Sequence, residues 1–415
     1  MLRVEGRIVN HDRAFYGEVS IDLSSGLIER VGEPSGRAEI QIDPRCLVFP
    51  GFGDVHVHAR EDAGGSQAYK EDFRTMSQAA VRGGVVHIAE MPNNPVPPVD
   101  DAGYRKKAGL ALKSEVHVTL YGGIGPKTNP ISFPVPYKVF MGPSVGDLFF
   151  TSKTELEKAI SRYRGADVSF HCEDPEVLEA HKNEPTHEAR RPLEAELSAI
   201  DFAVGLVERY GLRGKICHIS SYGGVERAIA AKRRGVSLAI EVTPHHLYFD
   251  ASMLTSENRP WLQMNPPLRT SPEDRLRLLR FLREGDIDYL ATDHAPHTIE
   301  EKQKGISGVP HLDTYGPFVT WLMKGHRFKP EDVARVSSWN PGRFVEPYLP
   351  GSFGKGFGKV EEGYAGSLTI IDPESPITIR REMLKTKCEW SPFEGVTFPG
   401  RVLYTILRGK VHTNE

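Results

Sequence analysis

The chain has 415 residues, and its 52 lysines and arginines against 55 aspartates and glutamates give a formal net charge of −3 at pH 7. This balance provides no chain-wide positive field for nucleic acid or an anionic membrane, so a small molecule is the expected partner. The N-terminal MLRVEGRIVN lacks the apolar stretch of a secretory signal, and no window approaches the roughly 18 apolar residues of a membrane span, so a cytoplasmic location is predicted.

The two ends of the chain have a similar pattern of short alternating strands with turn residues between them. Residues 1–50 contain RVEGRIVN, GEVSIDLSSGLIERVG and CLVFPG, and residues 350–415 contain EGYAGSLTIIDPE, ITIRREM and RVLYTILRGKVH. Neither end has enough strands to bury a sheet face alone. We therefore predict that residues 1–50 and 350–415 pair into one small β-sandwich domain.

Between the two ends, apolar β-branched segments alternate with helical patterns. The strand-like segments begin at Gly51, Val85, Glu115, Tyr137, Ala166, Lys215, Ser237 and Asp288. Stretches such as TELEKAISRYR, PLEAELSAIDFAVGLVERYG and SPEDRLRLLRFLREG have the apolar spacing of amphipathic helices. Alternation of strand and helix favours a parallel sheet, and eight repeats favour an α/β fold of the (β/α)8 TIM-barrel type over residues 51–349.

Polar side chains stand at the ends of several of these strands. His56 and His58 are two residues apart and therefore point to one face of their strand. His171, His218 and Asp293 each end a further strand, and the C-terminal strand ends of such a barrel gather the active site. Because a catalytic zinc ion generally takes three protein ligands, this set predicts two divalent metal ions.

Lys138 is an unexpected cation within the apolar segment YKVFMG. Two metal ions about 4 Å apart repel one another and need an anionic bridge. An ammonium beside them would be unfavourable, whereas a neutral lysine amine can add CO₂ and become an anionic carbamate. A carboxylated Lys138 is therefore the predicted bridging ligand.

The cysteines offer no metal site of their own. They are widely spaced without a CxxC pair, which favours reduced, buried thiols: Cys46, Cys172, Cys217 and Cys388. Because Cys172 and Cys217 adjoin His171 and His218, strand alternation predicts that both thiols face away from the metals, toward the helices.

Many short motifs follow one another in a recognisable order. They are HVHAR, MPNNP, KVFMG, FHCED, CHIS, EVTPHH, MNPPLR, ATDHAPH, NPGRF and EGYAGSLTIID. This series resembles the signature of the amidohydrolase superfamily and, within it, of the dihydroorotase family, over almost the whole chain. The chain departs from the family pattern at HARED, where HLREP is usual, and at His311, where the loop over the substrate ring commonly has glycine.

The resemblance implies a set of roles for individual residues. One metal ion, expected to be zinc, is bound by His56, His58 and Asp293, and the second by His171 and His218, with carboxylated Lys138 between them. The substrate carboxylate is bound by Arg60, Asn93 and His297, and Asn265 helps to hold the ring. The implied reaction is the reversible hydrolysis of dihydroorotate to N-carbamoyl-aspartate in pyrimidine synthesis, with Asp293 as general base and then general acid.

Other interpretations stay open at this stage. A hydantoinase or allantoinase shares the frame, but its uncharged ring substrates would leave Arg60 without a carboxylate to bind. A catalytically silent partner of a carbamoyltransferase would not need the intact ligand set, although an association with such an enzyme is not excluded. Arg60 could instead pair with Glu61 or Asp62, and Asn93 could serve only as a turn residue. The oligomeric state is open.

Overall fold

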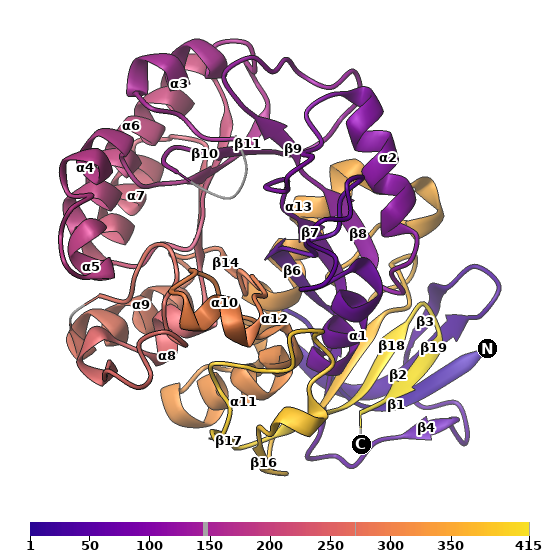
Figure 1. Ribbon diagram of the computed structural model, residues 1–415. Helices are drawn as coiled ribbons and strands as arrows, with labels where there is room; N and C mark the ends of the chain where they lie inside the picture. Colours follow the sequence, from indigo (N-terminus) through magenta and orange to yellow (C-terminus); the bar gives the residue numbers. More distant parts are fainter. Residues whose placement is uncertain (144–147, 270, 415) are drawn as a thin grey trace.

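The computed structural model describes residues 1–143, 148–269 and 271–414. Its centre is a barrel of parallel strands (Figure 1). One part of the wall is a sheet of β6 (Phe52–Val57), β7 (Val85–Glu90) and β8 (His117–Leu120). The other part comprises β9 (Gly122–Ile124), β10 (Tyr137–Phe140), β11 (Asp167–His171), β12 (Arg213–Ile216), β13 (Leu238–Val242) and β14 (Tyr289–Leu290).

The two sheets join into one closed wall. Only Tyr121 separates β8 from β9, so one run of chain belongs to both sheets. On the opposite side, the backbone N–H of His58 donates to the carbonyl oxygen of His294 at 2.9 Å, just beyond the ends of β6 and β14. This closure brings the metal-ligand candidates of the first and last strands next to one another.

Helices surround the barrel and connect its strands (Figure 1). The longer ones are α1 (Phe73–Gly83), α2 (Asp101–Ala111), α3 (Lys153–Ile160), α6 (Leu193–Tyr210), α7 (Tyr222–Arg233), α9 (Pro272–Glu284) and α11 (Tyr315–His326). The shorter ones are α4 (Pro175–Ala180), α5 (His187–Arg190), α8 (Pro244–Tyr248), α10 (Ile299–Gln303), α12 (Pro330–Ala334) and α13 (Asn340–Val345). Serine side chains cap two of these helices, because Ser152 and Ser271 accept hydrogen bonds from the first turns of α3 and α9.

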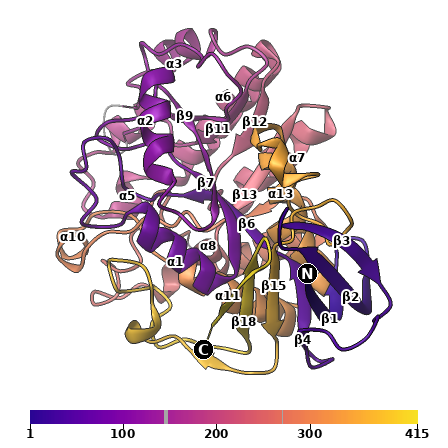
Figure 2. The same cartoon turned by 90° about the vertical axis from the view of Figure 1, so that its right-hand side faces the viewer.

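Both ends of the chain contribute strands to one eight-stranded sheet beside the barrel (Figure 2). Its strands are β1 (Leu2–Val9), β2 (Ala14–Asp22), β3 (Leu27–Gly32), β4 (Ile40–Gln41), β5 (Leu47–Pro50), β15 (Leu368–Asp372), β18 (Arg401–Leu407) and β19 (Lys410–Thr413). β15 pairs antiparallel with β5, with Leu368 opposite Pro50. The predicted fold class, a TIM-type barrel with a β-domain built from both ends, is confirmed, while the boundaries at 50 and 350 stay a prediction.

One segment near the C-terminus lies elsewhere than expected. ITIRREM is not a strand of the large sheet, because β16 (Ile377–Thr378) pairs with β17 (Thr397–Phe398) in a separate two-stranded sheet. The side chains of Ile379, Phe393 and Phe398 instead belong to the hydrophobic core of the barrel. The apolar positions of this segment are therefore buried against the barrel helices, which sequence periodicity could not distinguish from burial in a sandwich.

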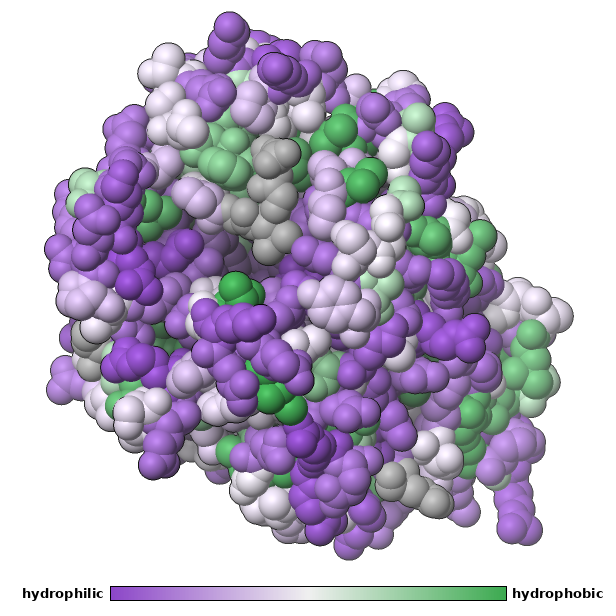
Figure 3. Space-filling view, viewed as in Figure 1, coloured by the Kyte–Doolittle hydropathy of each residue, from purple (hydrophilic) through white to green (hydrophobic). Residues whose placement is uncertain are grey.

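The surface is mainly hydrophilic on the face seen in Figure 3, with apolar residues scattered across it. Within residues 1–143, 148–269 and 271–414, no helix combines the length and the apolar character that crossing a membrane requires.

Candidate metal centre and active site

A cavity of about 350 Å³ opens at the C-terminal ends of the barrel strands. Eight of the ten residues predicted for the site line it: His56, His58, Arg60, Asn93, His171, His218, Asn265 and Asp293. Further lining residues include Phe140, Pro143 and the loop Gly305–Gly308. Residues separated by more than two hundred positions in the sequence thus meet in one cavity, because parallel strands end at one rim of the barrel.

The first group of polar side chains joins β6 to the end of β14. The Nε2 atoms of His56 and His58 lie 3.1 Å and 2.9 Å from Oδ1 of Asp293. Burial acts to raise the pKa of Asp293, but the charge of His56 and hydrogen bonds from both imidazoles outweigh it and hold the pKa well below its usual range. Asp293 is therefore a carboxylate with two imidazole nitrogens directed at one of its oxygens.

The second group is formed at the ends of β11 and β12. Nδ1 of His171 lies 2.9 Å from Nε2 of His218, and Nε2 of His171 lies 2.8 Å from Oε2 of Glu173. Burial lowers the pKa of both histidines, so both rings favour the neutral form that binds metal ions. Glu173 directs one nitrogen of His171 outward and leaves the other facing His218, as carboxylates behind metal-binding histidines do.

The donor atoms fit a metal centre. One donor atom each of His56, His218 and Asp293 lies within 4.8 Å of the others, which joins the two groups. Two imidazoles and a carboxylate that converge on one point match the nitrogen and oxygen ligands that divalent transition metals take. The described residues thus contain a site that can hold metal.

Glu241 supports this site from β13, and the sequence interpretation missed it. Its Oε1 lies 2.6 Å from Nδ1 of His56 and accepts the backbone N–H of His218 at 3.1 Å, while Oε2 binds the ammonium of Lys215. Burial acts to raise the pKa of Glu241, but Lys215 and His56 lower it to about 2. The carboxylate fixes the His56 ring so that Nε2 faces Asp293. A charged residue inside the apolar run SLAIEV was the available signal.

Lys138 lies on β10 with its side chain fully buried, and it is not among the residues that line the cavity. Its Nζ donates to Sγ of Cys217 at 2.9 Å, and it lies 5.2 Å from the ring centroid of Phe140. No carboxylate of the described residues forms an ion pair with this amine. A buried lysine at this position, without an acidic partner, matches the chemistry that carboxylation requires.

The predicted orientation of Cys217 is wrong. Its thiol contacts Lys138 and groups with donor atoms of His56 and Glu241 inside the barrel. β12 ends at Ile216, and His218 adopts a positive φ of 36°, so strand alternation no longer applies and both residues turn inward. The prediction of four buried free thiols is confirmed.

Arg60 faces the other side of the cavity and is only 2% exposed. Its Nε donates to the carbonyl oxygen of Pro296 at 3.3 Å, and its Nη2 lies 3.1 Å from Nε2 of His297. Its Nη1 has no hydrogen-bond partner within the described residues, and the same holds for Oδ1 of Asn265. The site thus presents a buried guanidinium and an amide oxygen toward the cavity, which suits an anionic ligand that also carries an N–H group.

Three residues that the sequence analysis singled out differ in whether they line the cavity. Asn93 lines the cavity directly, whereas His297 lies behind Arg60 and is outside the lining. His311 is also outside the lining, buried with Nε2 3.0 Å from Nδ1 of His245. The loop Gly305–Gly308 lines the cavity in place of His311.

A buried ion pair lies behind the loop that carries Asn93. Glu90 ends β7, and its Oε2 lies 2.7 Å from Nζ of Lys107 on α2. The same ammonium donates to the carbonyl oxygen of Met91 at 3.2 Å and to the side chain of Asn94. Burial raises the pKa of Glu90 to about 7 although Lys107 opposes this shift. Lys107 therefore ties the strand end, the loop and the helix together.

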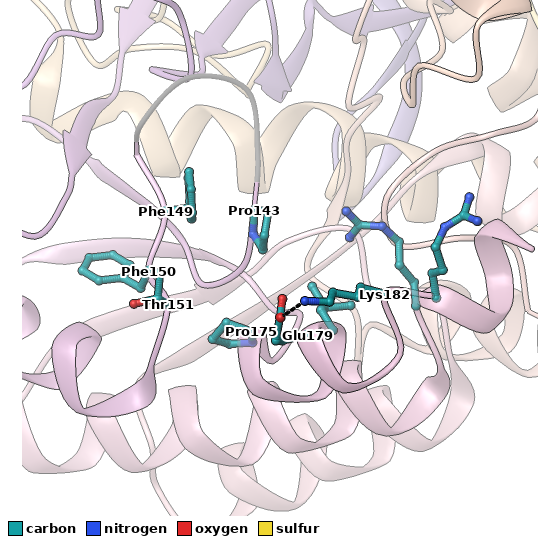
Figure 4. Close-up of a pocket in the computed structure, with 10 residues that line it drawn as sticks. Pro143, Phe149, Phe150, Thr151, Pro175, Glu179 and Lys182 are labelled. Atoms are coloured by element: carbon teal, nitrogen blue, oxygen red, sulfur yellow. Dashed lines mark hydrogen bonds and ion pairs between the residues drawn. The ribbon is translucent and has the colours of Figure 1, made fainter. Parts of the chain in front are cut away.

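A second cavity of about 450 Å³ shares Pro143 with the first. Figure 4 shows the residues that line this second cavity. Phe149 and Phe150 line one side, and Lys182 contacts Glu179 on another. Arg191, which also lines this cavity, binds Glu173 and so connects the cavity to the carboxylate that orients His171.

Comparisons with known proteins agree with this geometry. The solved L-hydantoinase from Arthrobacter aurescens is similar with a TM-score of 0.87 at 24% sequence identity, covering 99% of this chain and 95% of that chain. A D-hydantoinase from Thermus sp. is similar with a TM-score of 0.84 at 23% identity, covering 100% of this chain and 95% of that one. At these low sequence identities, the structural similarity shows that the fold is shared and does not by itself assign a function. The barrel, the β-domain and the cluster of histidines with an aspartate together define a TIM-barrel protein with a site that can hold metal at the C-terminal ends of its strands.

Sequence comparison narrows this class. The dihydroorotase of Pyrococcus furiosus is 32% identical, with 99% of this chain and 92% of that protein covered. The dihydroorotase of Thermococcus kodakarensis is also 32% identical, with 99% of this chain and 94% of that protein covered. No family model matches. The chain belongs to the dihydroorotase family.

Proposed function

We propose that the protein is a metal-dependent dihydroorotase that interconverts dihydroorotate and N-carbamoyl-aspartate in pyrimidine synthesis. The observation that carries this proposal is the buried guanidinium of Arg60, whose Nη1 has no partner in the described residues and whose neighbours line the cavity. Dihydroorotate has a carboxylate on its ring, whereas hydantoin and allantoin do not. A guanidinium held out of water favours the substrate with the carboxylate.

The proposal includes two divalent metal ions, with zinc as the expected element. His56, His58 and Asp293 would hold one ion and His171 and His218 the other, with carboxylated Lys138 as the shared anionic ligand. Such ions polarise a ring carbonyl and lower the pKa of water when they are bound. In support, all these side chains are buried and, apart from Lys138, line one cavity.

The side chains of the chain itself would position the substrate and move the proton. Arg60 and Asn93 would bind the substrate carboxylate, with His297 holding Arg60 from behind, and Asn265 would accept a hydrogen bond from the ring. The carboxylate of Asp293, kept ionised by its imidazole neighbours, would accept a proton from the attacking water. The same oxygen would then donate that proton to the leaving ring nitrogen, which completes ring opening.

The proposal is tested by comparing substrates on the purified, zinc-loaded protein. We expect hydrolysis of dihydroorotate and the reverse cyclisation of N-carbamoyl-aspartate, with much lower rates for hydantoin and allantoin, and two zinc ions per chain by elemental analysis. Faster turnover of hydantoin or allantoin would assign the protein to those ureides instead. Two bound metals without turnover of any of these compounds would favour a silent partner of a carbamoyltransferase.

A further inference from the structure

Lys302 on α10 is a fully buried lysine outside the metal centre. Its Nζ donates to three backbone carbonyl oxygens, those of Gln263 at 3.0 Å, Ile306 at 2.8 Å and Gly308 at 2.8 Å. The ring of Trp390 lies 5.6 Å away, and no carboxylate of the described residues pairs with this ammonium. The charge is therefore balanced only by carbonyl dipoles and an aromatic face.

The three carbonyls belong to two segments that border the candidate substrate cavity. Ile306 and Gly308 lie in the loop Gly305–Gly308, which lines the cavity, and Gln263 lies two residues before Asn265, which lines it as well. The backbone N–H of Gly308 also donates to the carbonyl of Gln263 at 3.0 Å. Lys302 thus holds together two walls of one cavity.

The loop is held mainly by polar contacts, which include the side chain of Gln263 donating to Oγ of Ser307 at 3.2 Å. Ile306 is 41% exposed, so its side chain contributes limited apolar burial. Gly308 has a φ of +131°, and a Cβ there would lie 2.7 Å from the carbonyl oxygen of Ala295, so the backbone packs closely in a conformation that side chains disfavour. Lys302 therefore adds two direct hydrogen bonds to a backbone that few apolar contacts hold against the cavity.

The number of donors matches the number of acceptors. An ammonium has three N–H donors for the three carbonyls, whereas a neutral amine has two and would turn its lone pair toward the third oxygen. A hydrocarbon side chain such as methionine would fill the same space without the cost of burying a charge, but it would leave all three carbonyls without this donor. The clamp therefore depends on the charged form.

We propose that Lys302 is a positioning residue whose ammonium holds the loop Gly305–Gly308 in the shape that receives the substrate ring. This inference rests on the proposed function, because it assumes that the substrate occupies the cavity lined by the loop. Loss of the clamp would weaken substrate binding and leave the metal-binding side chains in place.

The clamp is also expected to respond to pH near neutrality. Burial lowers the pKa of Lys302 to about 7. Two titratable groups face it: burial raises the pKa of the Cys388 thiol to about 12, and burial together with the charge of Arg60 lowers the pKa of His297 far below its usual value. Neither group changes charge near pH 7, so the third hydrogen bond is lost there by deprotonation of Lys302 itself.

The test compares Lys302→Met with Lys304→Met, a matched control that removes an exposed lysine two residues further along the chain. Hydrogen exchange of the amides of residues 305–309 is measured at pH 6 and pH 8, corrected for intrinsic exchange rates, together with KM, kcat and zinc content. Lys302→Met should speed exchange at pH 6 by at least roughly three- to tenfold, because the loss of a single hydrogen bond has that effect and the variant removes three. It should raise KM for dihydroorotate by a similar factor, with kcat and zinc content nearly unchanged, while Lys304→Met should change none of these.

In the wild-type protein, corrected exchange of the same amides should be faster at pH 8 than at pH 6, and Lys302→Met should abolish that difference. Exchange in Lys302→Met that matches the wild type at pH 6 would overturn the proposal. If that variant does not fold, the pH comparison on the wild type decides, and equal corrected exchange at both pH values would refute the clamp. A wild-type protein that does not turn over dihydroorotate would refute the proposed function, and the exchange measurements would still decide the role of Lys302.

Discussion

Replacing Arg60 with methionine should separate substrates with a carboxylate from substrates without one. Arg60 is 2% exposed, and its Nη1 has no partner in the described residues, so a substrate carboxylate would bind in a site already removed from water. Truncating one partner of such a buried charge pair costs about 2 to 5 kcal/mol. At about 1.4 kcal/mol per factor of ten, kcat/KM for dihydroorotate should fall by roughly 30- to 5,000-fold.

The assay measures kcat/KM of the wild type, Arg60→Met and Arg60→Lys on dihydroorotate and on dihydrouracil, the same ring without its carboxylate. Any dihydrouracil hydrolysis should change little in Arg60→Met. Arg60→Lys, which keeps the charge but loses the two-pronged geometry, should lie between wild type and Arg60→Met on dihydroorotate. Zinc content and the thermal midpoint are the controls, because Arg60 also contacts Pro296 and His297. An equal fall for both substrates would refute the assignment and make Arg60 a support of the metal site or fold.

Three further substitutions test other parts of the structure. Lys138→Ala should lower zinc content below two per chain and abolish turnover, with partial recovery of both in added acetate or propionate; two zinc ions and full turnover in this variant would exclude the bridging role. Asp293→Asn should lower kcat by at least about 10²- to 10⁴-fold, as loss of an acid–base group does, whereas a normal rate with normal zinc content would remove Asp293 from proton transfer. Lys107→Met should lower the free energy of unfolding at pH 8 by about 1 to 3 kcal/mol, because Glu90 and the carbonyl oxygen of Met91 lose their buried donor. The pKa of Glu90 is already raised to about 7 and would rise further, so protonation should shrink this deficit at pH 6, and urea unfolding that shows an equal deficit at both pH values would contradict the argument.

The positions of the metal-ligand candidates could be predicted from the sequence because two general rules of strand and barrel geometry are enough to place them. Alternation along β6 places His56 and His58 on one face, and the parallel barrel places the ends of its strands at one rim. Those two rules hold whatever the details of packing. They are the reason that His171, His218 and Asp293 could be assigned to the same cavity without knowledge of any contact.

The roles of the side chains that support the site could not be predicted from the sequence, although some of these residues are unusual in their sequence context. Glu241, Glu90 and Lys215 are charged residues within apolar strands, which marks them as unusual. Their partners could not be inferred, because His56 is 185 residues from Glu241 in sequence and the pairing exists only in the closed barrel. Lys302 left no such signal, because it lies in a polar stretch and its acceptors are backbone carbonyls, which every residue has.

The sequence by itself determined the types of the elements, their order and the polar residues at the strand ends, since these depend on local periodicity and on the general geometry of a parallel barrel. Only the tertiary structure decided where chain segments outside regular strands point. Cys217 turns inward because His218 has a positive φ, His297 lies behind Arg60, and the segment after β16 is buried on the barrel. These placements depend on contacts between residues far apart in sequence, and no periodic pattern records them.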